Sequence, residues 1–555
     1  MRRSLIARPA ALFIVLSLGA CECGVPVEGD PDGASTVDAG HTLDDASAVD
    51  ATAADLSGVD LTRPDSGGVD AGAAADSGSS DLAQPDLGQT TPDSGAGDDS
   101  SVADAAPQDA TVPPQPGFAQ APLGTSLSRA WVYVLTHEPF ISGLTVTMGE
   151  VTPAVIDRYF DDFNATAVHT WADGLGVPIN SWRQQGDVPY VSWITDVGLS
   201  TSNSLELGGM PADVPGRIGY QIGDEPRDQA EFDEYWTGVQ VAQQQDPDAL
   251  VILNWSYHAD DLLPGFFQTA AETWNVDIFS YDTYSTSRDV YERYDQFSKV
   301  CRQYDMPCWR YLDSYWDGSH DDDLAEIDMR WDAFAGLVFG YSGHTWFLYQ
   351  VAAGSNGLHS NLFDVNNDWD ALPTEKFAWA ARINRDLRFL GETTNQLKPL
   401  DARFAYHWPT IPDWGIAIAL PPGVDVWEVG AGGDPYLQSV GCPEGEADMD
   451  IPIGFFEDGF GSRYVMVQNG NHPGGSWPTE SDQPGELLLS FDFSTAPAGF
   501  DPSILRTLDL QSEQIVHLPL TDLGGGLREL RHSLDAGEVL LFKYANGEPF
   551  ARRAP

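Results

Sequence analysis

An acidic pair at the end of an expected strand is the part of the sequence most suited to chemistry. The stretch from Arg217 to Pro226 reads RIGYQIGDEP, in which bulky apolar residues alternate with small or polar ones. Such alternation predicts a β-strand with one apolar face. Glu225 falls on the other face, at the carboxyl end, where parallel barrels carry their active sites. The stretch therefore predicts a catalytic glutamate; the alternative is that its acids, Asp224 above all, only cap the following helix.

Polar and aromatic residues also end the other expected strands of this region. If these strands meet at one mouth, carboxylates lie there among Trp and Tyr. That composition suits sugars, because aromatic faces stack on pyranose rings while acids and amides bind the hydroxyls. For any single Trp, packing in the core is the alternative. The expected ligand contacts are Trp171, Trp193, Asp224, Asn254, Trp255, Tyr284, Tyr315 and Trp346.

The elements that must position these side chains are eight short apolar runs, which alternate with helical patterns. The runs cover 131–136, 165–171, 189–195, 217–222, 249–255, 276–284, 307–315 and 344–350, and the clearest helical stretches are 229–245, 324–339 and 375–390. Their number and spacing predict a (β/α)8 barrel over residues 118–400, with His137 and Glu138 ending the first strand. An open doubly wound sheet is the alternative, but no glycine-rich phosphate loop opens the region.

Several short motifs, taken in order, resemble the large clan of barrel glycoside hydrolases that carries an acid/base glutamate after strand four. They are Gly223-Asp224-Glu225-Pro226, Asp246-Pro247, Asp282-Thr283-Tyr284, the stretch from Phe339 to Phe347, Ile383-Asn384 and Leu390-Gly391. The resemblance covers residues 126–400 and implies hydrolysis of O-glycosidic bonds in a carbohydrate. Two departures stand out. Asp224 replaces the usual Asn, and no glutamate follows the seventh strand, where Asp313 is offered instead.

A mechanism follows from the resemblance. One carboxylic acid protonates the leaving oxygen, and a second carboxylate acts as nucleophile or activates water. We expect Glu225 to be the acid, kept protonated by burial and by Asp224 or Asp282 nearby. Asp313 is the expected second carboxylate and Asp282 the reserve. Because Asp is shorter than Glu, the pair predicts the wide spacing of inversion, about 6.5–9.5 Å, over the about 5–5.5 Å of retention.

The amino-terminal residues predict export. Arg2 and Arg3 precede an apolar run at 10–18 and the sequence Leu18-Gly19-Ala20-Cys21. This pattern resembles a bacterial lipoprotein signal over 1–20, with a lipid on Cys21 holding the protein to a membrane at the cell surface or in the periplasm. Ordinary secretion, or no export, is the alternative. Residues 21–117 contain no aromatic residue and are rich in Asp, Ala, Ser, Gly and Pro, which predicts a disordered linker.

Composition and cysteines limit the partners. The chain has 555 residues and a formal net charge of −56, which argues against nucleic acid and anionic membrane surfaces. No metal-binding spacing occurs, so no metal or cofactor is expected. Cys301 and Cys308 flank an expected helix-to-strand turn and predict a local disulfide in an exported protein, with two free thiols as the alternative.

Residues 401–555 have a different pattern. Short alternating runs at 415–420, 464–468, 486–493, 515–518 and 538–542 lie between Gly, Pro, Asn and Asp turns, which predicts an antiparallel β-sandwich. We expect it to brace the barrel; binding of carbohydrate is the alternative. The whole chain is thus predicted to be an exported, lipid-anchored glycoside hydrolase. A surface carbohydrate-binding protein without catalysis is the alternative, and a barrel enzyme of another class, such as a lyase, is a third possibility.

Overall fold

The computed structural model describes the folded part of the chain in segments. These are residues 127–145, 151–171, 182, 188–194, 215–256, 263–284, 290–314, 324–350, 362–363, 373–407, 423–443, 449–470 and 484–553. The predicted signal, Cys21, the linker and the run at 415–420 lie outside them. No helix within these segments has the length and apolar character needed to cross a membrane.

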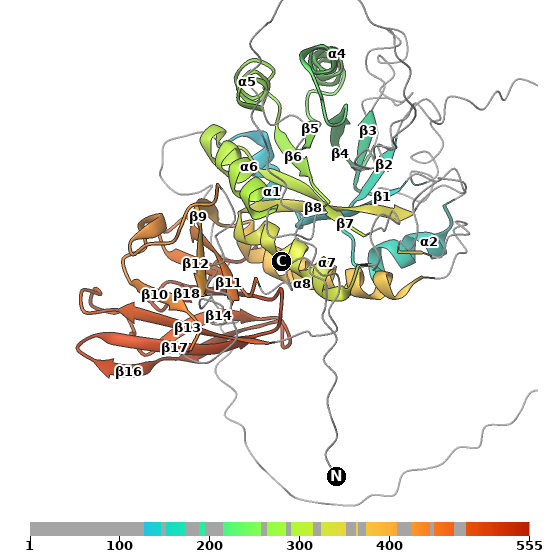
Figure 1. The fold of residues 1–555 in the computed structure, drawn as a ribbon. Helices are drawn as coiled ribbons and strands as arrows, with labels where there is room; N and C mark the ends of the chain where they lie inside the picture. The colour runs from blue at the N-terminus through green and yellow to red at the C-terminus, as the bar shows by residue number, and fades with distance from the viewer. Residues whose placement is uncertain are drawn as a thin grey trace, which may run out of the picture. The chain divides into compact units, whose positions relative to one another are not determined.

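Eight parallel strands form a closed barrel, in which each strand pairs with the next and β8 pairs with β1 (Figure 1). They are β1 (Phe140–Thr145), β2 (Val168–Trp171), β3 (Tyr190–Ile194), β4 (Arg217–Ile222), β5 (Leu250–Ser256), β6 (Ile278–Asp282), β7 (Cys308–Asp313) and β8 (Tyr341–Gln350). The predicted barrel is confirmed. Apolar side chains fill the barrel interior near the amino ends of the strands, including the stacked rings of Phe140 and Trp309. Polar groups can therefore gather only at the mouth, at the carboxyl ends of the strands.

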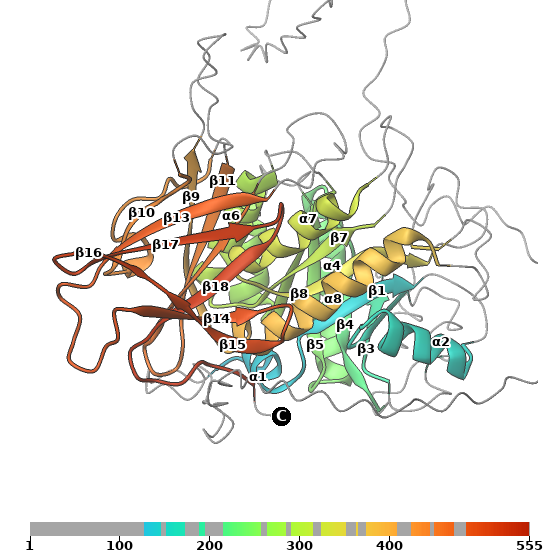
Figure 2. The same ribbon diagram turned by 90° about the horizontal axis from the view of Figure 1, so that it is seen from below.

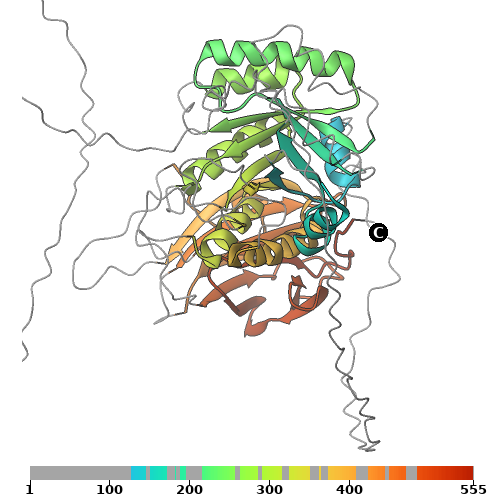
Figure 3. The same ribbon diagram turned by 90° about the vertical axis from the view of Figure 1, so that its right-hand side faces the viewer.

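Helices lie outside the ring of strands (Figures 1 and 3). They are α2 (Pro153–Asp157), η3 (Arg158–Asp162), α4 (Gln229–Gln245), α5 (Leu263–Gln268), η6 (Thr269–Thr273), α6 (Val290–Tyr304), α7 (Glu326–Val338) and α8 (Glu375–Thr394). The carboxylate of Asp228 caps α4, accepting from the backbone N–H groups of Ala230 and Glu231 at 2.8 and 3.0 Å. Asp228 therefore has the capping role that was the alternative for Asp224.

The first predicted strand is wrong. Residues 131–136 belong to helix α1 (Arg129–Thr136), whose first turn is capped by the Ser128 hydroxyl. Its buried residues are Ala130, Trp131, Val134 and Leu135, which share one helical face. Glu138 follows α1 and precedes β1, so it lies at the amino end of the barrel, where it pairs with Arg388 of α8 at 2.8 Å. His137 stacks on Tyr133 in the same place, and neither residue reaches the mouth.

Two antiparallel sheets form the carboxyl-terminal region, and Figure 2 shows their strands in orange to red. One contains β10 (Leu437–Gly441), β13 (Gly485–Asp492), β17 (Leu527–Leu534) and β16 (Thr521–Gly524), and the other contains β15 (Gln514–Pro519), β14 (Ile504–Asp509), β18 (Val539–Tyr544), β12 (Arg463–Gln468), β11 (Met449–Glu457) and β9 (Lys398–His407). Side chains of both sheets, such as Leu489 and Phe542, share one apolar core. That shared core explains the alternating apolar runs of this region.

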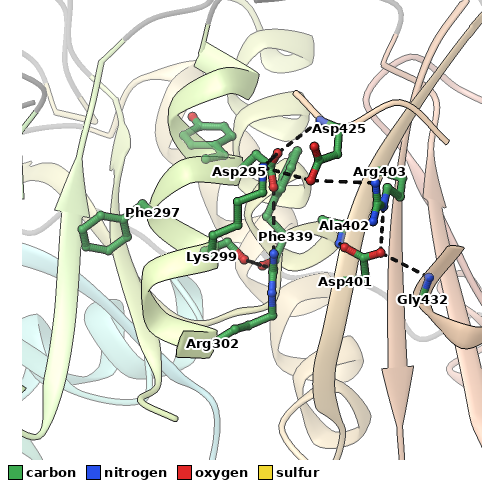
Figure 4. Close-up of polar contacts among 12 residues, drawn as sticks. Asp295, Phe297, Lys299, Arg302, Phe339, Asp401, Ala402, Arg403, Asp425 and Gly432 are labelled. Carbon is green, nitrogen blue, oxygen red and sulfur yellow. Dashed lines mark hydrogen bonds and ion pairs between the residues drawn. The ribbon is translucent and has the colours of Figure 1, made fainter. Parts of the chain in front are cut away.

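A group of charged side chains joins α6 to β9 and the segment near Asp425 (Figure 4). We call it the α6–β9 ion cluster; its members are Asp295, Lys299, Arg302, Asp401, Arg403 and Asp425. The Nζ atom of Lys299 lies 2.8 Å from Asp295 and 3.0 Å from Asp425. Arg403 lies 2.7 Å from Asp401. The cluster therefore ties a barrel helix to the second sheet through alternating opposite charges.

A disulfide joins Cys301, in the last turns of α6, to Cys308 at the start of β7. Their Cα atoms are 5.9 Å apart. The cross-link fixes the end of the helix to the beginning of the strand that carries Tyr311 and Asp313 into the barrel.

Candidate active site

Strand β4 turns sharply where its acids begin. Gly223 has a φ of +65°, and a Cβ atom there would lie 2.4 Å from the ring of Tyr235, so only glycine fits. Glu225 has a φ of +38°, which is a left-handed conformation. For a residue other than glycine this conformation costs about 1–3 kcal/mol. Its backbone N–H donates to the carbonyl of Asn254 at 3.2 Å, which ties the turn to β5. The backbone of this turn is thus held in a strained form beside the barrel mouth.

Three carboxyl groups meet at the ends of β4 and β6. We call Asp224, Glu225 and Asp282 the acid cluster. The side-chain amide of Asn254 donates to Asp224 Oδ1 at 2.9 Å and to Asp282 Oδ2 at 3.0 Å. The carboxyl groups of Asp282 and Glu225 lie within hydrogen-bonding reach of each other, and this contact raises the pKa of Asp282.

Asp282 is the acid of this cluster whose proton affinity its surroundings raise. Its pKa is raised well above the ordinary value, first by burial and then by the negative charges of Glu225 and Asp224, against which the Asn254 amide acts weakly. Asp282 is only 5% exposed, whereas Glu225 is partly exposed. Burial and the neighbouring acids therefore favour the protonated form of Asp282. The role of Glu225 as the acid stays a prediction.

A layer of polar side chains lies directly beneath the acid cluster. The Tyr311 hydroxyl of β7 donates to Gln221 Oε1 of β4 at 2.8 Å, and Gln221 Nε2 donates to Asp224 Oδ1 at 3.5 Å. Burial and the three acids raise the pKa of Tyr311, so it stays protonated and remains a donor. Neither residue is among the predicted site residues. Strand alternation was the available signal, since Tyr311 and Gln221 lie two positions before Asp313 and Gly223 on the same inward face.

His169 of β2 completes this layer and was also missed. Its Nδ1 lies 3.3 Å from the Thr345 hydroxyl of β8, and its ring centroid lies 5.7 Å from that of Tyr311. Burial lowers the pKa of His169 to about 3, so the ring is neutral. A neutral imidazole adds no positive charge that would offset the acids above it.

Three other predicted residues lie at the mouth end of the barrel. Asp313 is the last residue of β7, is partly exposed, and has the inward alternation of Tyr311. Trp193 donates its indole N–H to the carbonyl of Gly223 at 3.1 Å and packs against Tyr311. Tyr284, just beyond β6, packs against Phe347 with ring centroids 5.2 Å apart. Trp193 and Tyr284 therefore build the wall around the acids.

Two predicted ligand contacts are wrong. Trp255 is fully buried on the outer face of β5, with its ring centroid 4.6 Å from that of Phe267. Trp346 is fully buried on the outer face of β8, where its indole N–H donates to Asn384 Oδ1 of α8 at 2.7 Å. Each follows an inward residue by one position, and alternation turns it away from the mouth. The side chain of Trp171, and all of Tyr315, lie outside the described residues.

The acid cluster is not arranged as a metal centre. Within the segments that the structure describes, no group of three or more His, Cys, Asp or Glu side chains could hold a metal ion. The groups that face the acids are amides, a phenol and one another. What the arrangement can do is hold and transfer a proton.

Comparison with known proteins gives structural neighbours alone. A scan against protein-family models finds no match, and a search of curated proteins finds no relative. Among solved structures, a protein described as a glycoside hydrolase is 10% identical, with a TM-score of 0.43 over 74% of this chain and 93% of its own. A GH30 endoxylanase from Clostridium papyrosolvens C71 is 10% identical, with a TM-score of 0.40 over 74% and 97%. A family 5 glycoside hydrolase from Bacteroides vulgatus ATCC 8482 is 11% identical, with a TM-score of 0.43 over 75% and 91%.

Proposed function

We propose that this protein is a glycoside hydrolase that cleaves O-glycosidic bonds of an oligo- or polysaccharide. The observation that carries the proposal is the adjoining carboxyl pair of Glu225 and Asp282 at the carboxyl ends of the barrel strands, with the pKa of Asp282 raised. An acid whose pKa is raised by burial and by neighbouring carboxyl groups is suited to supply the proton that a leaving glycosidic oxygen needs. Tyr284, which is partly exposed near the pair, offers aromatic surface to a sugar.

The two members of the pair have separate tasks in this mechanism. Glu225, the more exposed acid, contacts the glycosidic oxygen, and the buried Asp282 keeps a proton available to it. As the bond between the anomeric carbon and the leaving oxygen breaks, that oxygen takes the proton from Glu225. Asp313 is the second carboxylate, which either accepts a proton from an attacking water or bonds to the anomeric carbon itself.

The stereochemical course tests the role of Asp313. A water-activating Asp313 gives a product of inverted anomeric configuration, and a nucleophilic Asp313 gives retention. Proton NMR of the first product formed distinguishes the two. In Asp313→Asn, turnover should fall by about 10³-fold, and added azide should restore it as a glycosyl azide. Full activity of that variant would remove Asp313 from the mechanism.

The activity itself is tested with the full chain on a panel of polysaccharides. New reducing ends support hydrolysis. Unsaturated products would indicate a lyase. Binding to a polysaccharide without any product would indicate a binding protein. Either result overturns the proposal. Glu225→Gln should abolish turnover and keep sugar binding. The matched control is Glu234→Gln, which changes an exposed glutamate of α4 in the same way.

We also propose that the protein is exported and held to a membrane by a lipid on Cys21. The motif around Cys21 supports this. In a bacterial host, the wild-type chain should fractionate with membranes and incorporate labelled fatty acid, whereas Cys21→Ser should do neither. Incorporation of label into the Cys21→Ser variant would contradict the assignment.

A further inference from the structure

The polar layer beneath the acids forms a directional series of hydrogen bonds. The phenol of Tyr311 has a single hydrogen, which it donates to Gln221 Oε1 at 2.8 Å. In this arrangement Gln221 Oε1 faces Tyr311 and Gln221 Nε2 faces Asp224. The reverse orientation of the amide would turn its oxygen toward a carboxylate. With the observed orientation, Gln221 Nε2 donates to Asp224 Oδ1. Tyr311 of β7 thus holds the amide donor that faces Asp224, which follows β4.

The series continues from Asp224 to the pair of Glu225 and Asp282. Asp224 Oδ1 also accepts from the Asn254 amide, whose second acceptor is Asp282 Oδ2. The side-chain oxygen Oδ1 of Asn254 is buried and has no hydrogen-bond partner among the described residues. Within that part of the chain, the hydrogen bonds of the side-chain amide go to its two acid acceptors alone. If Asp224 draws the amide toward itself, Asp282 loses its neutral donor and is left with Glu225.

We propose that Tyr311 and Gln221 are positioning residues that set the proton affinity of the Glu225–Asp282 pair through Asp224 and Asn254. This inference rests on the proposed function and adds to it a second layer, which does not touch the substrate. The charged and titratable groups that face Asp282 are Asp224 and Glu225 beyond β4 and Tyr311 on β7, with neutral Asn254 on β5. Loss of the phenol hydrogen should strengthen the negative field on Asp282 and raise its proton affinity.

Kinetics give the first test. Tyr311→Phe keeps the ring and removes the hydrogen bond, so kcat should fall about tenfold while KM changes by less than about twofold. The alkaline limb of the kcat–pH profile should move to higher pH. Gln221→Met, which keeps the length of the side chain and removes its amide, should move the limb in the same direction. It serves as the second variant should Tyr311→Phe fail to fold.

The matched control is Tyr341→Phe. Tyr341 is a buried tyrosine on the outer face of β8, and its hydroxyl donates to the carbonyl of Tyr294 at 3.4 Å. Loss of this hydroxyl removes a similar buried bond without affecting the acids. Its pH profile should match the wild type, whereas a purely structural role for Tyr311 would make the two variants alike.

A second readout needs no turnover. An infrared titration of the wild type should show a protonated carboxyl band that persists above the pH at which exposed carboxyls ionise, and Asp282→Asn should remove it. In Tyr311→Phe this band should persist to higher pH than in the wild type. An unchanged titration overturns the inference. A wild-type protein inactive on every sugar would sink the proposed function instead, and the infrared titration would still decide the role of Tyr311.

Discussion

Asp282 at the barrel mouth and Asp295 in the α6–β9 ion cluster are both almost fully buried, at 5% and 1% exposure, and burial raises the pKa of each. Their surroundings differ. Lys299 and Arg302 lower the pKa of Asp295 and partly offset burial (Figure 4). Around Asp282 the charged neighbours are acids, which raise its pKa further. Cations offset the charge of one aspartate, whereas the other lies among acids that favour its protonated form.

The difference separates a structural use of a buried acid from a chemical one. A carboxylate paired with cations fixes two elements together, and its charge state need not change. A carboxyl paired with other carboxyls exchanges protons easily, and such like-charge groups in a mouth are candidates for catalysis. The comparison predicts that changes at the mouth alter turnover and leave stability nearly unchanged, while changes in the ion cluster do the reverse.

The largest effect should come from Glu225→Gln. The amide cannot give a proton to a leaving oxygen, so kcat should fall by about 10³-fold. Thermal unfolding should move little, because the change removes one negative charge from a group of three acids. Turnover on the best substrate and the unfolding midpoint are measured on the same preparation. A variant that loses stability along with activity would break the contrast between the two regions.

The next effect should come from Asp295→Ala, which leaves Lys299 and Arg302 without their shared acid. Loss of one partner from a buried ion pair costs about 3 kcal/mol of unfolding free energy. Urea unfolding measures it, and kcat of the folded variant should stay within about twofold of the wild type. A tenfold loss of kcat without loss of stability would show that the ion cluster affects the mouth.

The barrel could be predicted because strand alternation and helix length depend on local sequence. The exception is α1, where the β-branched and aromatic residues of 131–136 favour a strand by propensity, but the Ser128 cap and the burial of one helical face prevail. Tertiary packing against the barrel floor, through Ala130, decides this conformation. No local pattern contains that contact.

Only the part of the site that lies at the carboxyl ends of strands could be predicted from the sequence. Glu225, Asp282 and Asn254 were found because each lies at or near the carboxyl end of a strand. Their pairing depends on strand order. Strand β5 lies between β4 and β6, so Asn254 can contact both acids. Tyr311 and Gln221 look like core residues in the sequence, and only the alternation of two strands across the barrel brings them together.

A pH experiment sharpens the comparison at a smaller scale. The folded-state pKa of Asp282 is raised above its unfolded value of about 3.9. Its contribution to stability is therefore complete below about pH 4 and is lost as pH rises through the folded pKa. Asn does not titrate, so the wild type should lose stability relative to Asp282→Asn as pH rises from about 4 towards the folded pKa. Urea unfolding at several pH values measures this difference, and a constant difference would contradict the raised pKa.

The smallest effect should come from Asp425→Asn. Asp425 lies 3.0 Å from Lys299 and is 43% exposed at its side chain, so solvent and salt screen the pair. Such an exposed ion pair contributes less than about 1 kcal/mol to the unfolding free energy. The loss should shrink further at high salt, whereas the loss in Asp295→Ala should persist because Asp295 is buried. If both variants responded equally to salt, burial would not be what distinguishes these two acids of the same cluster.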